Sequence, residues 1–341
     1  MDLLIGADVG GTTSKVVACG ADGNVRAYGS AAGGNIHSSG ASALGHVFEA
    51  MARALEDAGD GGVIGAHLGI AGAGPARFEE IRSLCTEQGA RLGIDPAVLV
   101  VTTDLETAFA ASSGGGEGLL VISGTGAVAA VFEDFRMAGR CDGMGWLLGD
   151  EGSGTWIGLR ALHSVAASID HRGSPTSLRG PVLRAIAGDR TVTAEDRGPL
   201  GDPRQQMIAD AYGLPPAAFA ALAPLVLEHA RDGDTISRTI VADAAEALAR
   251  TARGAVVDAY GSGAPPTGAA VLAGGLLGVG GPLRERVSAL LARGLPMVPV
   301  VPDALAAPPV VGAVRLAARA ARVPVDLAEL RRQVLESTPF S

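Results

Sequence analysis

Near its N-terminus the chain reads Asp8-Val9-Gly10-Gly11-Thr12-Thr13-Ser14-Lys15. An apolar segment, Leu3 to Asp8, precedes the glycines, and a second one, Lys15 to Ala18, follows them. The pattern predicts a strand, a glycine-rich turn and a second strand, and Ala21-Asp22-Gly23-Asn24 predicts a hairpin to a third strand, Val25 to Tyr28. A carboxylate at a strand end, beside backbone N–H groups and hydroxyls, suits a triphosphate with Mg²⁺. An ordinary hairpin turn is the alternative.

Alternating helices and strands follow this first segment. Apolar residues spaced three and four apart predict helices at 41–58 and 75–91. Continuous apolar runs predict buried strands at Val63 to Ile70 and at Val98 to Thr102. Strands that alternate with helices in this way predict an α/β fold built from βαβ units.

The order of strand, small-residue turn and strand then occurs a second time. It comprises Gly118 to Ile122, Ser123-Gly124-Thr125-Gly126 and Ala127 to Phe132. Two such units predict an internal duplication of a nucleotide-holding segment. The proline-rich segment 168–216 shows no clear pattern. The remaining periodicity predicts helices at 217–231, 235–259, 281–293 and Val310 to Ala321, and strands at Ala269 to Leu272 and Met297 to Val301.

Composition excludes several classes of protein. The 341 residues suffice for two domains, and they include 50 glycines and a single lysine, Lys15. Because Ser14 precedes that lysine, no Gly-Lys-Ser/Thr phosphate loop is possible, and the protein-kinase motifs V-A-I-K and D-F-G do not occur. A net charge of −9 and a pI of about 5.2 give no basic surface for nucleic acid or an anionic membrane. We therefore expect a small-molecule partner.

Targeting signals and cysteines add further expectations. No signal-peptide pattern and no apolar run long enough for a membrane span is found, so we expect a cytoplasmic protein. Cys19, Cys85 and Cys141 are widely separated and lack metal-ligand spacing. They are expected to be reduced thiols, mostly in the core.

Three further segments carry candidate functional groups. Asp104 lies just beyond an apolar strand, where a carboxylate can accept the proton of an attacking hydroxyl. A helix N-cap is the alternative for Asp104, and Glu106 in the next helical turn can simply favour the helix dipole. Ser123-Gly124-Thr125-Gly126-Ala127 is a shorter copy of the first turn. Gly274-Gly275 ends a buried strand and can let a flat base approach the backbone.

The segment Gly143–Gly158 holds both tryptophans of the chain, together with Asp150 and Glu151. An aromatic face beside carboxylates suits a sugar ring, which has an apolar face and a rim of hydroxyls. So many glycines weaken any regular element, which favours a binding loop. His37 and Asn35 lie in another polar loop that can line a pocket, although a solvent-facing position is the alternative for His37.

Taken in order, these motifs resemble the phosphate, connecting and adenosine segments of the sugar kinase, actin and Hsp70 ATPase superfamily. The segments are Asp8-Val9-Gly10-Gly11-Thr12, Asp104, Ser123-Gly124-Thr125-Gly126, Ala273-Gly274-Gly275 and Pro309-Val310-Val311-Gly312-Ala313. The run Gly145-Trp146-Leu147-Leu148-Gly149-Asp150-Glu151-Gly152-Ser153 is similar to the BadF/BadG-type ATPase family. That family includes N-acetylglucosamine kinases, and the chain looks most like the actinobacterial glucosamine kinases. The resemblance covers nearly the whole chain.

The resemblance implies two ribonuclease H-like, actin-like ATPase domains with ATP in the cleft between them. The first would comprise residues 1–114 plus 310–341, and the larger second one residues 115–309, with a helical insertion near 168–235. A homodimer is expected.

The resemblance also assigns roles to residues of this chain. Asp8 would hold Mg²⁺ through water, and Asp104 would be the base acting on the sugar 6-hydroxyl. ATP would be bound by Gly10, Gly11, Thr12, Thr13, Lys15, Gly124, Thr125, Gly126, Gly274 and Gly275, although the Lys15 side chain can also point to solvent. The sugar would be bound by Asn35, Asp104, Trp146, Leu147, Leu148 and Asp150.

Two departures from the family pattern bear on the substrate. Ala127 stands where the second phosphate segment usually ends in serine, and Met144 stands where the N-acetyl-specific kinases carry tryptophan. Free glucosamine is largely a cation, which a set of carboxylates would favour over a neutral acetamide: Asp104, Glu106, Asp142, Asp150 and Glu151. We therefore expect an ATP- and Mg²⁺-dependent kinase that makes glucosamine 6-phosphate, with N-acetylglucosamine kinase as the alternative.

Two other classes of protein are weaker alternatives. A reductase-activating ATPase needs cysteines for an iron–sulfur cluster, and the three cysteines are scattered. A non-catalytic sugar sensor is expected to carry a helix-turn-helix segment, and none precedes Asp8.

Overall fold

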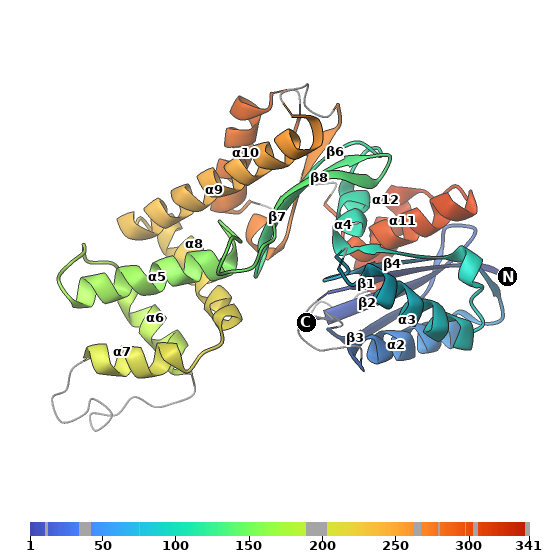
Figure 1. Ribbon diagram of the computed structural model, residues 1–341, viewed down its shortest axis with the longest axis horizontal. Helices are drawn as coiled ribbons and strands as arrows, with labels where there is room; N and C mark the ends of the chain where they lie inside the picture. Colours follow the sequence, from blue (N-terminus) through green and yellow to red (C-terminus); the bar gives the residue numbers. More distant parts are fainter. Residues whose placement is uncertain are drawn as a thin grey trace. The chain divides into compact units, whose positions relative to one another are not determined.

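A computed structural model describes residues 1–10, 13–33, 42–74, 76–188, 203–261, 267–278, 280–296, 298–302 and 306–337. The chain divides into two compact units, drawn in Figure 1. Unit 1 comprises Met1–Gly116, Glu133–Arg136 and Val301–Ser341, and unit 2 comprises Glu117–Phe132 and Met137–Val300.

Unit 1 contains a five-stranded sheet in the order β3-β2-β1-β4-β5. Its strands are β1 (Asp2–Val9), β2 (Thr13–Gly20), β3 (Val25–Ala32), β4 (Gly62–Ile70) and β5 (Leu99–Thr103). The first three strands are antiparallel, whereas β4 pairs parallel to β1 and β5 pairs parallel to β4. The predicted hairpins and buried strands are thereby confirmed. The carboxyl ends of β1, β4 and β5 lie along one edge of the sheet.

Helices cover both faces of this sheet (Figure 1). Apolar residues of α2 (Ser42–Ala58) and α3 (Phe78–Arg91) pack on one face. The other face packs against α11 (Pro309–Ala321) and α12 (Leu327–Ser337). The short helix η1 (Pro96–Val98) leads into β5, and α4 (Asp104–Ser112) follows β5 directly and contacts α11.

Helix α11 lies unusually close to its neighbours because two glycines leave room for it. A Cβ atom at Gly312 would lie 2.0 Å from the Thr107 carbonyl oxygen of α4. A Cβ atom at Gly6 of β1 would lie 2.5 Å from the Val314 backbone nitrogen of α11. Both contacts are with backbone atoms, which cannot rotate away. The Pro309–Ala313 segment is therefore a helix start that packs between α4 and β1.

Unit 2 contains a four-stranded sheet in the order β8-β7-β6-β9. Its strands are β6 (Gly118–Ser123), β7 (Ala127–Glu133), β8 (Arg136–Asp142) and β9 (Ala269–Ala273). As in unit 1, three strands follow one another across the sheet and a later strand pairs parallel to the first of them. The repeated strand order agrees with the duplication that the two small-residue turns predict.

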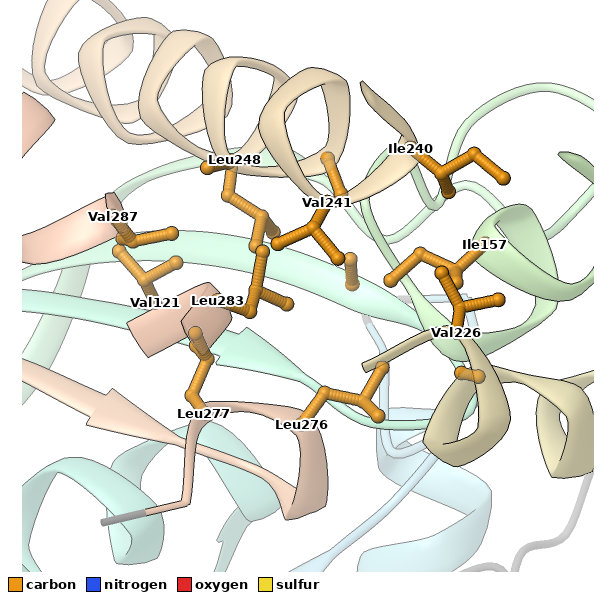
Figure 2. Close-up of a cluster of buried hydrophobic side chains, with 14 of the residues drawn as sticks. Val121, Ile157, Val226, Ile240, Val241, Leu248, Leu276, Leu277, Leu283 and Val287 are labelled. Carbon is orange, nitrogen blue, oxygen red and sulfur yellow. The ribbon is translucent and has the colours of Figure 1, made fainter. Parts of the chain in front are cut away.

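One large apolar core holds the helices of unit 2 onto its sheet. The helices are α5 (Gly154–Ile169), α6 (Arg179–Ala187), α7 (Pro203–Tyr212), η3 (Pro216–Leu222), α8 (Ala223–Arg231), α9 (Thr235–Tyr260), η4 (Gly275–Leu277) and α10 (Pro282–Gly294). Figure 2 shows Val121 of β6 among Leu248 of α9, Leu283 and Val287 of α10, and Leu277 of η4. The loop after β9 is therefore anchored by its apolar side chains.

Several predicted elements differ from the observed ones. The helix predicted at 217–231 is split into η3 and α8, because Pro224 lies in the first turn of α8 and cannot continue a helix begun earlier. The strand predicted at Met297 to Val301 is only an isolated bridge between Ala270 and Val300, and Met297 lies outside the described residues. Strand β8 and helices α5 and α12 were not predicted.

The two units differ from the expected domain ranges at several places. Residues 133–136, expected in the second domain, belong to unit 1. The reason is Phe135, whose ring lies 6.2 Å from that of Phe109 and is covered by the Arg315 guanidinium at 4.7 Å. Residues 301–309 also belong to unit 1 rather than to the second domain, where the Ala307 backbone N–H donates to Ser112 Oγ at the end of α4, at 3.0 Å.

Among the described residues, no single helix has the length and apolarity to cross a membrane. One pair of helices bent by 120°, Arg204–Tyr212 with Pro216–Arg231, meets the criteria of length and composition. Phe219, Leu222 and Val226 of that pair lie in the core of unit 2.

Replacing Gly312 by alanine is expected to lower the free energy of unfolding by about 3 kcal/mol, because the new methyl group overlaps the α4 backbone. The control is Gly45→Ala in α2, where a Cβ atom meets nothing within 4 Å and helix propensity should add about 0.5–1 kcal/mol. Urea denaturation of both variants measures the difference. Equal stability of the two variants would contradict the close approach of α11 and α4.

His67 of β4 should make unit 1 sensitive to acid. Its Nε2 atom lies 3.0 Å from Thr102 Oγ1, and burial lowers its pKa from 6.5 to about 4. Between pH 6.5 and pH 4 the unfolded chain binds a proton that the folded chain does not, so stability falls as the pH falls. His67→Gln should therefore lose less stability across this window than the native chain, by on the order of 1–3 kcal/mol. His46→Gln, at an exposed position of α2, is the control and should keep the native slope.

Candidate functional site

The first part of the site is the half-buried carboxylate of Asp8, at the end of β1. The pKa of Asp8 is raised from 3.8 to about 7, mainly by burial and also by the nearby Asp104 carboxylate, whereas Lys15 lowers it. Lys15 lies opposite Asp8 in the β1–β2 ladder, so both side chains are on the same face of the sheet. Because burial disfavours the charged form of Asp8, a cation beside it would stabilise the carboxylate.

The proximity of Asp8 and Asp104 has a steric cause. Gly69 of β4 pairs with Asp8, and a Cβ atom at Gly69 would lie 2.3 Å from the Thr107 hydroxyl of α4. That hydroxyl donates to the Asp104 carbonyl at 3.0 Å. The missing side chain at Gly69 thus lets the first turn of α4 lie against β4, beside the end of β1.

Asp104 is the first residue of α4 and not its cap. The N-cap is Thr103, whose hydroxyl accepts the Leu105 backbone N–H at 3.2 Å. Glu106 accepts a hydrogen bond from the Thr103 hydroxyl, so it fixes the helix start as well as favouring the helix dipole. The N-cap interpretation of Asp104 is therefore wrong, and its carboxylate is left for another function. Burial raises the pKa of Asp104 and of Glu106.

The glycine-rich turn of unit 1 is described only in part. Gly10 donates its N–H to the Thr13 carbonyl at 3.1 Å, which closes the turn between β1 and β2. Gly11, Thr12 and Asn35, and with them two phosphate contacts and one sugar contact of the prediction, lie outside the described residues.

In unit 2 the turn Ser123–Ala127 and the segment 150–155 form one hydrogen-bonded body. The Ser123 hydroxyl donates to the Gly152 carbonyl at 2.8 Å, and the Gly154 N–H donates to the Gly124 carbonyl at 2.7 Å. The Thr155 hydroxyl donates to the Thr125 carbonyl at 2.9 Å. Two motifs that were predicted separately, one for phosphate and one for sugar, are thus held together.

This body offers unsatisfied donors. Within the described parts of the chain, the backbone N–H groups of Thr125 and Gly126 donate to no protein acceptor. A Cβ atom at Gly124 would meet nothing within 4 Å, so the turn is open at that residue. The N-terminus of the 16-residue helix α5, capped by Ser153, starts directly beside it. Adjacent N–H groups near a helix N-terminus are suited to anionic oxygens.

Three of the predicted sugar-binding residues, Trp146, Leu147 and Leu148, lie on an exposed loop, and Asp150 directly follows it. The exposed fractions of Trp146, Leu147 and Leu148 are 49%, 74% and 73%, so their apolar surfaces are available to a ligand. Asp150 is half-buried, burial raises its pKa, and its Oδ1 accepts the Ala127 backbone N–H at 3.1 Å. Asp150 therefore already holds the Ser123–Ala127 turn, and its contact with a sugar stays a prediction.

The two glycines after β9 have different surroundings. Gly274 has φ +91°, and a Cβ atom there would lie 2.3 Å from the Ser123 carbonyl oxygen. At Gly275 a Cβ atom would meet nothing within 4 Å. Gly274 is therefore needed for packing against the Ser123–Ala127 turn. Gly275 has open space beside it, where the sequence predicts the nucleoside. Buried Arg284 holds this loop by donating to the Leu272 and Leu277 carbonyls, both at 3.1 Å.

Asp8 is the residue of this chain that would hold Mg²⁺, as a single carboxylate rather than as part of a cage of protein ligands. Among the described residues, no group of three or more His, Cys, Asp or Glu side chains is arranged to hold a metal ion. Mg²⁺ commonly uses one or two carboxylates, waters and substrate phosphates.

The cysteines do not form a cluster site. All three are free thiols, with Cys19 and Cys85 buried and Cys141 half-buried. Burial raises the pKa of Cys19 and of Cys85 to about 12, which disfavours the thiolates that iron–sulfur clusters require.

The folds and motifs agree with a family of ATPases. Residues 5–317 match the sequence profile of the BadF/BadG/BcrA/BcrD ATPase family, and the chain belongs to that family. The resemblance inferred from its motifs is thereby confirmed.

Two relatives are similar to parts of the chain. N-acetyl-D-glucosamine kinase of Dictyostelium discoideum is 37% identical over 134 residues, which cover 38% of each chain. N-acetylmuramic acid/N-acetylglucosamine kinase of Clostridium acetobutylicum is 32% identical over 181 residues, which cover 52% of this chain and 54% of the relative. The alignments thus span between about a third and about half of these relatives.

A crystal structure from Chromobacterium violaceum resembles nearly the whole chain. It is described as that of a candidate N-acetylglucosamine kinase, with 26% identity and a TM-score of 0.68. The alignment covers 92% of this chain and 98% of that chain. The expected α/β fold of two actin-like ATPase domains is confirmed.

Two residues that organise the site were missed from the sequence. The sequence placed Asp142 only within a set of acidic residues. Its carboxylate accepts the backbone N–H groups of Met144, Asp150 and Glu151, within and just after the loop that carries Trp146. The Asp142-Gly143 pair is a turn signal that hints at this role. Arg284 gives no such signal, because its partners Leu272 and Leu277 are chosen by tertiary packing.

Alanine at the two glycines after β9 should have opposite effects. Gly274→Ala places a methyl group against Ser123 at a positive φ, so we expect loss of several kcal/mol of stability or failure to fold. Gly275→Ala should leave the melting temperature unchanged, because its methyl group enters open space. The same methyl group should weaken ATP binding, because it would occupy the space predicted for the nucleoside. Thermal unfolding with and without ATP measures both effects. Native ATP affinity in Gly275→Ala would remove Gly275 from the nucleotide site.

Proposed function

We propose that this protein transfers the γ-phosphoryl group of ATP to the 6-hydroxyl group of an amino sugar. The observation that carries the proposal is the pair of half-buried carboxylates in unit 1, Asp8 at the end of β1 and Asp104 at the start of α4. A kinase acting on a hydroxyl needs one carboxylate near the metal-bound phosphates and another that accepts the hydroxyl proton. The free N–H groups of Thr125 and Gly126 supply anion-binding donors.

In this reaction Asp104 accepts the proton of the 6-hydroxyl as its oxygen attacks the γ-phosphorus atom. The bond between that phosphorus and the bridging oxygen to the β-phosphate breaks, and ADP leaves. Asp8 would hold Mg²⁺ through water, and the ion supplies neutralisation of phosphate charge. Gly10, Thr13, Lys15 and the Gly124–Gly126 turn would bind the phosphates.

N-acetylglucosamine is the first candidate acceptor. Both curated relatives carry N-acetylglucosamine in their names, and so does the Chromobacterium violaceum structure. These names fit N-acetylglucosamine better than the glucosamine predicted from the sequence.

Glucosamine is the second candidate, and one structural feature favours it. Asp142 and Asp150 flank the exposed loop and form no ion pair with any described residue, and of their neighbours Glu151 is paired with Arg250 at 3.1 Å. Carboxylates without an ion-pair partner near this loop favour a cationic amine over a neutral acetamide.

A cytoplasmic homodimer that binds neither nucleic acid nor membranes stays a prediction.

Release of ADP with a panel of sugars tests the proposal. We expect N-acetylglucosamine or glucosamine to give the highest kcat/KM, and the ratio of the two values decides between the candidates. Phosphorylation at O6 is checked by NMR of the product. ATP hydrolysis that no sugar stimulates would reject the kinase function.

The Asp104→Asn variant should lose kcat by about 10²-fold or more while it retains ATP binding, because an amide cannot accept the hydroxyl proton. Glu106→Gln is the matched control. It changes a neighbouring carboxylate that caps the same helix, and it should keep most of the kcat. Substantial turnover by Asp104→Asn would remove Asp104 from the role of base.

A further inference from the structure

The exposed loop Gly143–Gly149 is bridged at its base by the side chain of Asp142, at the end of β8. Asp142 Oδ1 accepts the Asp150 backbone N–H at 2.7 Å, and its Oδ2 accepts the Glu151 N–H at 2.9 Å. Oδ1 is also 3.4 Å from the Met144 nitrogen, at the start of the loop. This carboxylate thus bridges the start and the end of the loop, in addition to the bond that the Gly149 N–H donates to the Gly145 carbonyl at 2.8 Å.

The space around this carboxylate is tight. A Cβ atom at Gly149 would lie 2.1 Å from Asp142 Oδ1, so the end of the loop passes directly against the carboxylate. Asp142 and Asp150 have φ values of +67° and +55°, in the left-handed region that non-glycine residues rarely adopt. Such conformations persist where surrounding interactions hold the backbone in place. Here those interactions are the hydrogen bonds that the Asp142 carboxylate accepts.

The same network connects the loop to the phosphate turn. The Asp150 backbone N–H is bound by Asp142, while the Asp150 side chain accepts the Ala127 N–H at 3.1 Å. The Gly143 N–H donates to the Ala127 carbonyl at 2.9 Å. Ala127 directly follows the turn that carries the free N–H groups. Loss of the Asp142 bonds would therefore free the end of the loop, whereas the bonds of Gly143 and Asp150 to Ala127 would remain.

We infer that Asp142 is the positioning residue of the acceptor site. It touches no reacting atom, and it holds Asp150 and the apolar side chains of Met144, Trp146 and Leu148 in one arrangement for the sugar. The inference rests on the proposed function for its ligand. It assigns to Asp142 an effect on the affinity for the sugar that exceeds any effect on ATP.

Amide hydrogen exchange tests the closure of the loop without any ligand. Asp142→Asn keeps one acceptor oxygen and turns an NH₂ group toward a backbone N–H, and Asp142→Glu has no room for its extra methylene beside Gly149. Both variants should exchange the amides of residues 144–151 at least tenfold faster. Asp258→Asn is the matched control, because Asp258 also accepts a backbone N–H of β8, that of Arg140 at 2.9 Å, and binds none in the loop.

Steady-state kinetics tests the role in acceptor binding. In Asp142→Asn the KM for the sugar should rise about tenfold or more, the KM for ATP should stay within twofold, and Asp258→Asn should match the native protein. A native sugar KM in Asp142→Glu, or an equal rise in both KM values, would overturn the inference. Absence of sugar phosphorylation by the native protein would reject the proposed function instead, and native exchange rates in both Asp142 variants would still overturn the loop closure.

Discussion

The contact of helix α4 with β4 and α11 brings two half-buried carboxylates of unit 1, Asp8 and Asp104, near each other. Gly69 and Gly312 make this contact possible, because a Cβ atom at either one would overlap atoms of Thr107. The helix start that carries Asp104 therefore comes to lie at the end of β1, next to Asp8. Burial there raises the pKa of both carboxyl groups, because it disfavours their charged forms.

Unit 2 meets a different requirement, the combination of open donors with a rigid backbone. The Ser123–Ala127 turn is bonded to the start of α5 and packed against Gly274, while its Thr125 and Gly126 N–H groups stay available. Arg284 and the apolar side chains of η4 hold the loop beside it. Preorganised donors of this kind bind anionic groups without reorganisation of the backbone.

Much of the fold was predictable, and the misses have physical reasons. Buried strands such as β1 and β4 and long amphipathic helices such as α9 give strong periodic patterns, and the family match confirms the architecture. Strand β8 was missed because it lies at the edge of its sheet, where only Gly139 is buried and the apolar pattern is weak. Helix α5 was missed because its glycines were interpreted as part of a binding loop.

The sequence by itself determined the order of the glycine-rich turns, the α/β class and the types of side chain at the site, because these follow from local pattern and composition. Only the tertiary structure decided that Thr103 rather than Asp104 caps α4, that Gly274 serves the packing of Ser123, and that Asp142 closes the Trp146 loop. The reason is physical. Clearances of a few tenths of an ångström and hydrogen bonds between separate segments arise only when those segments pack, and no local pattern records them.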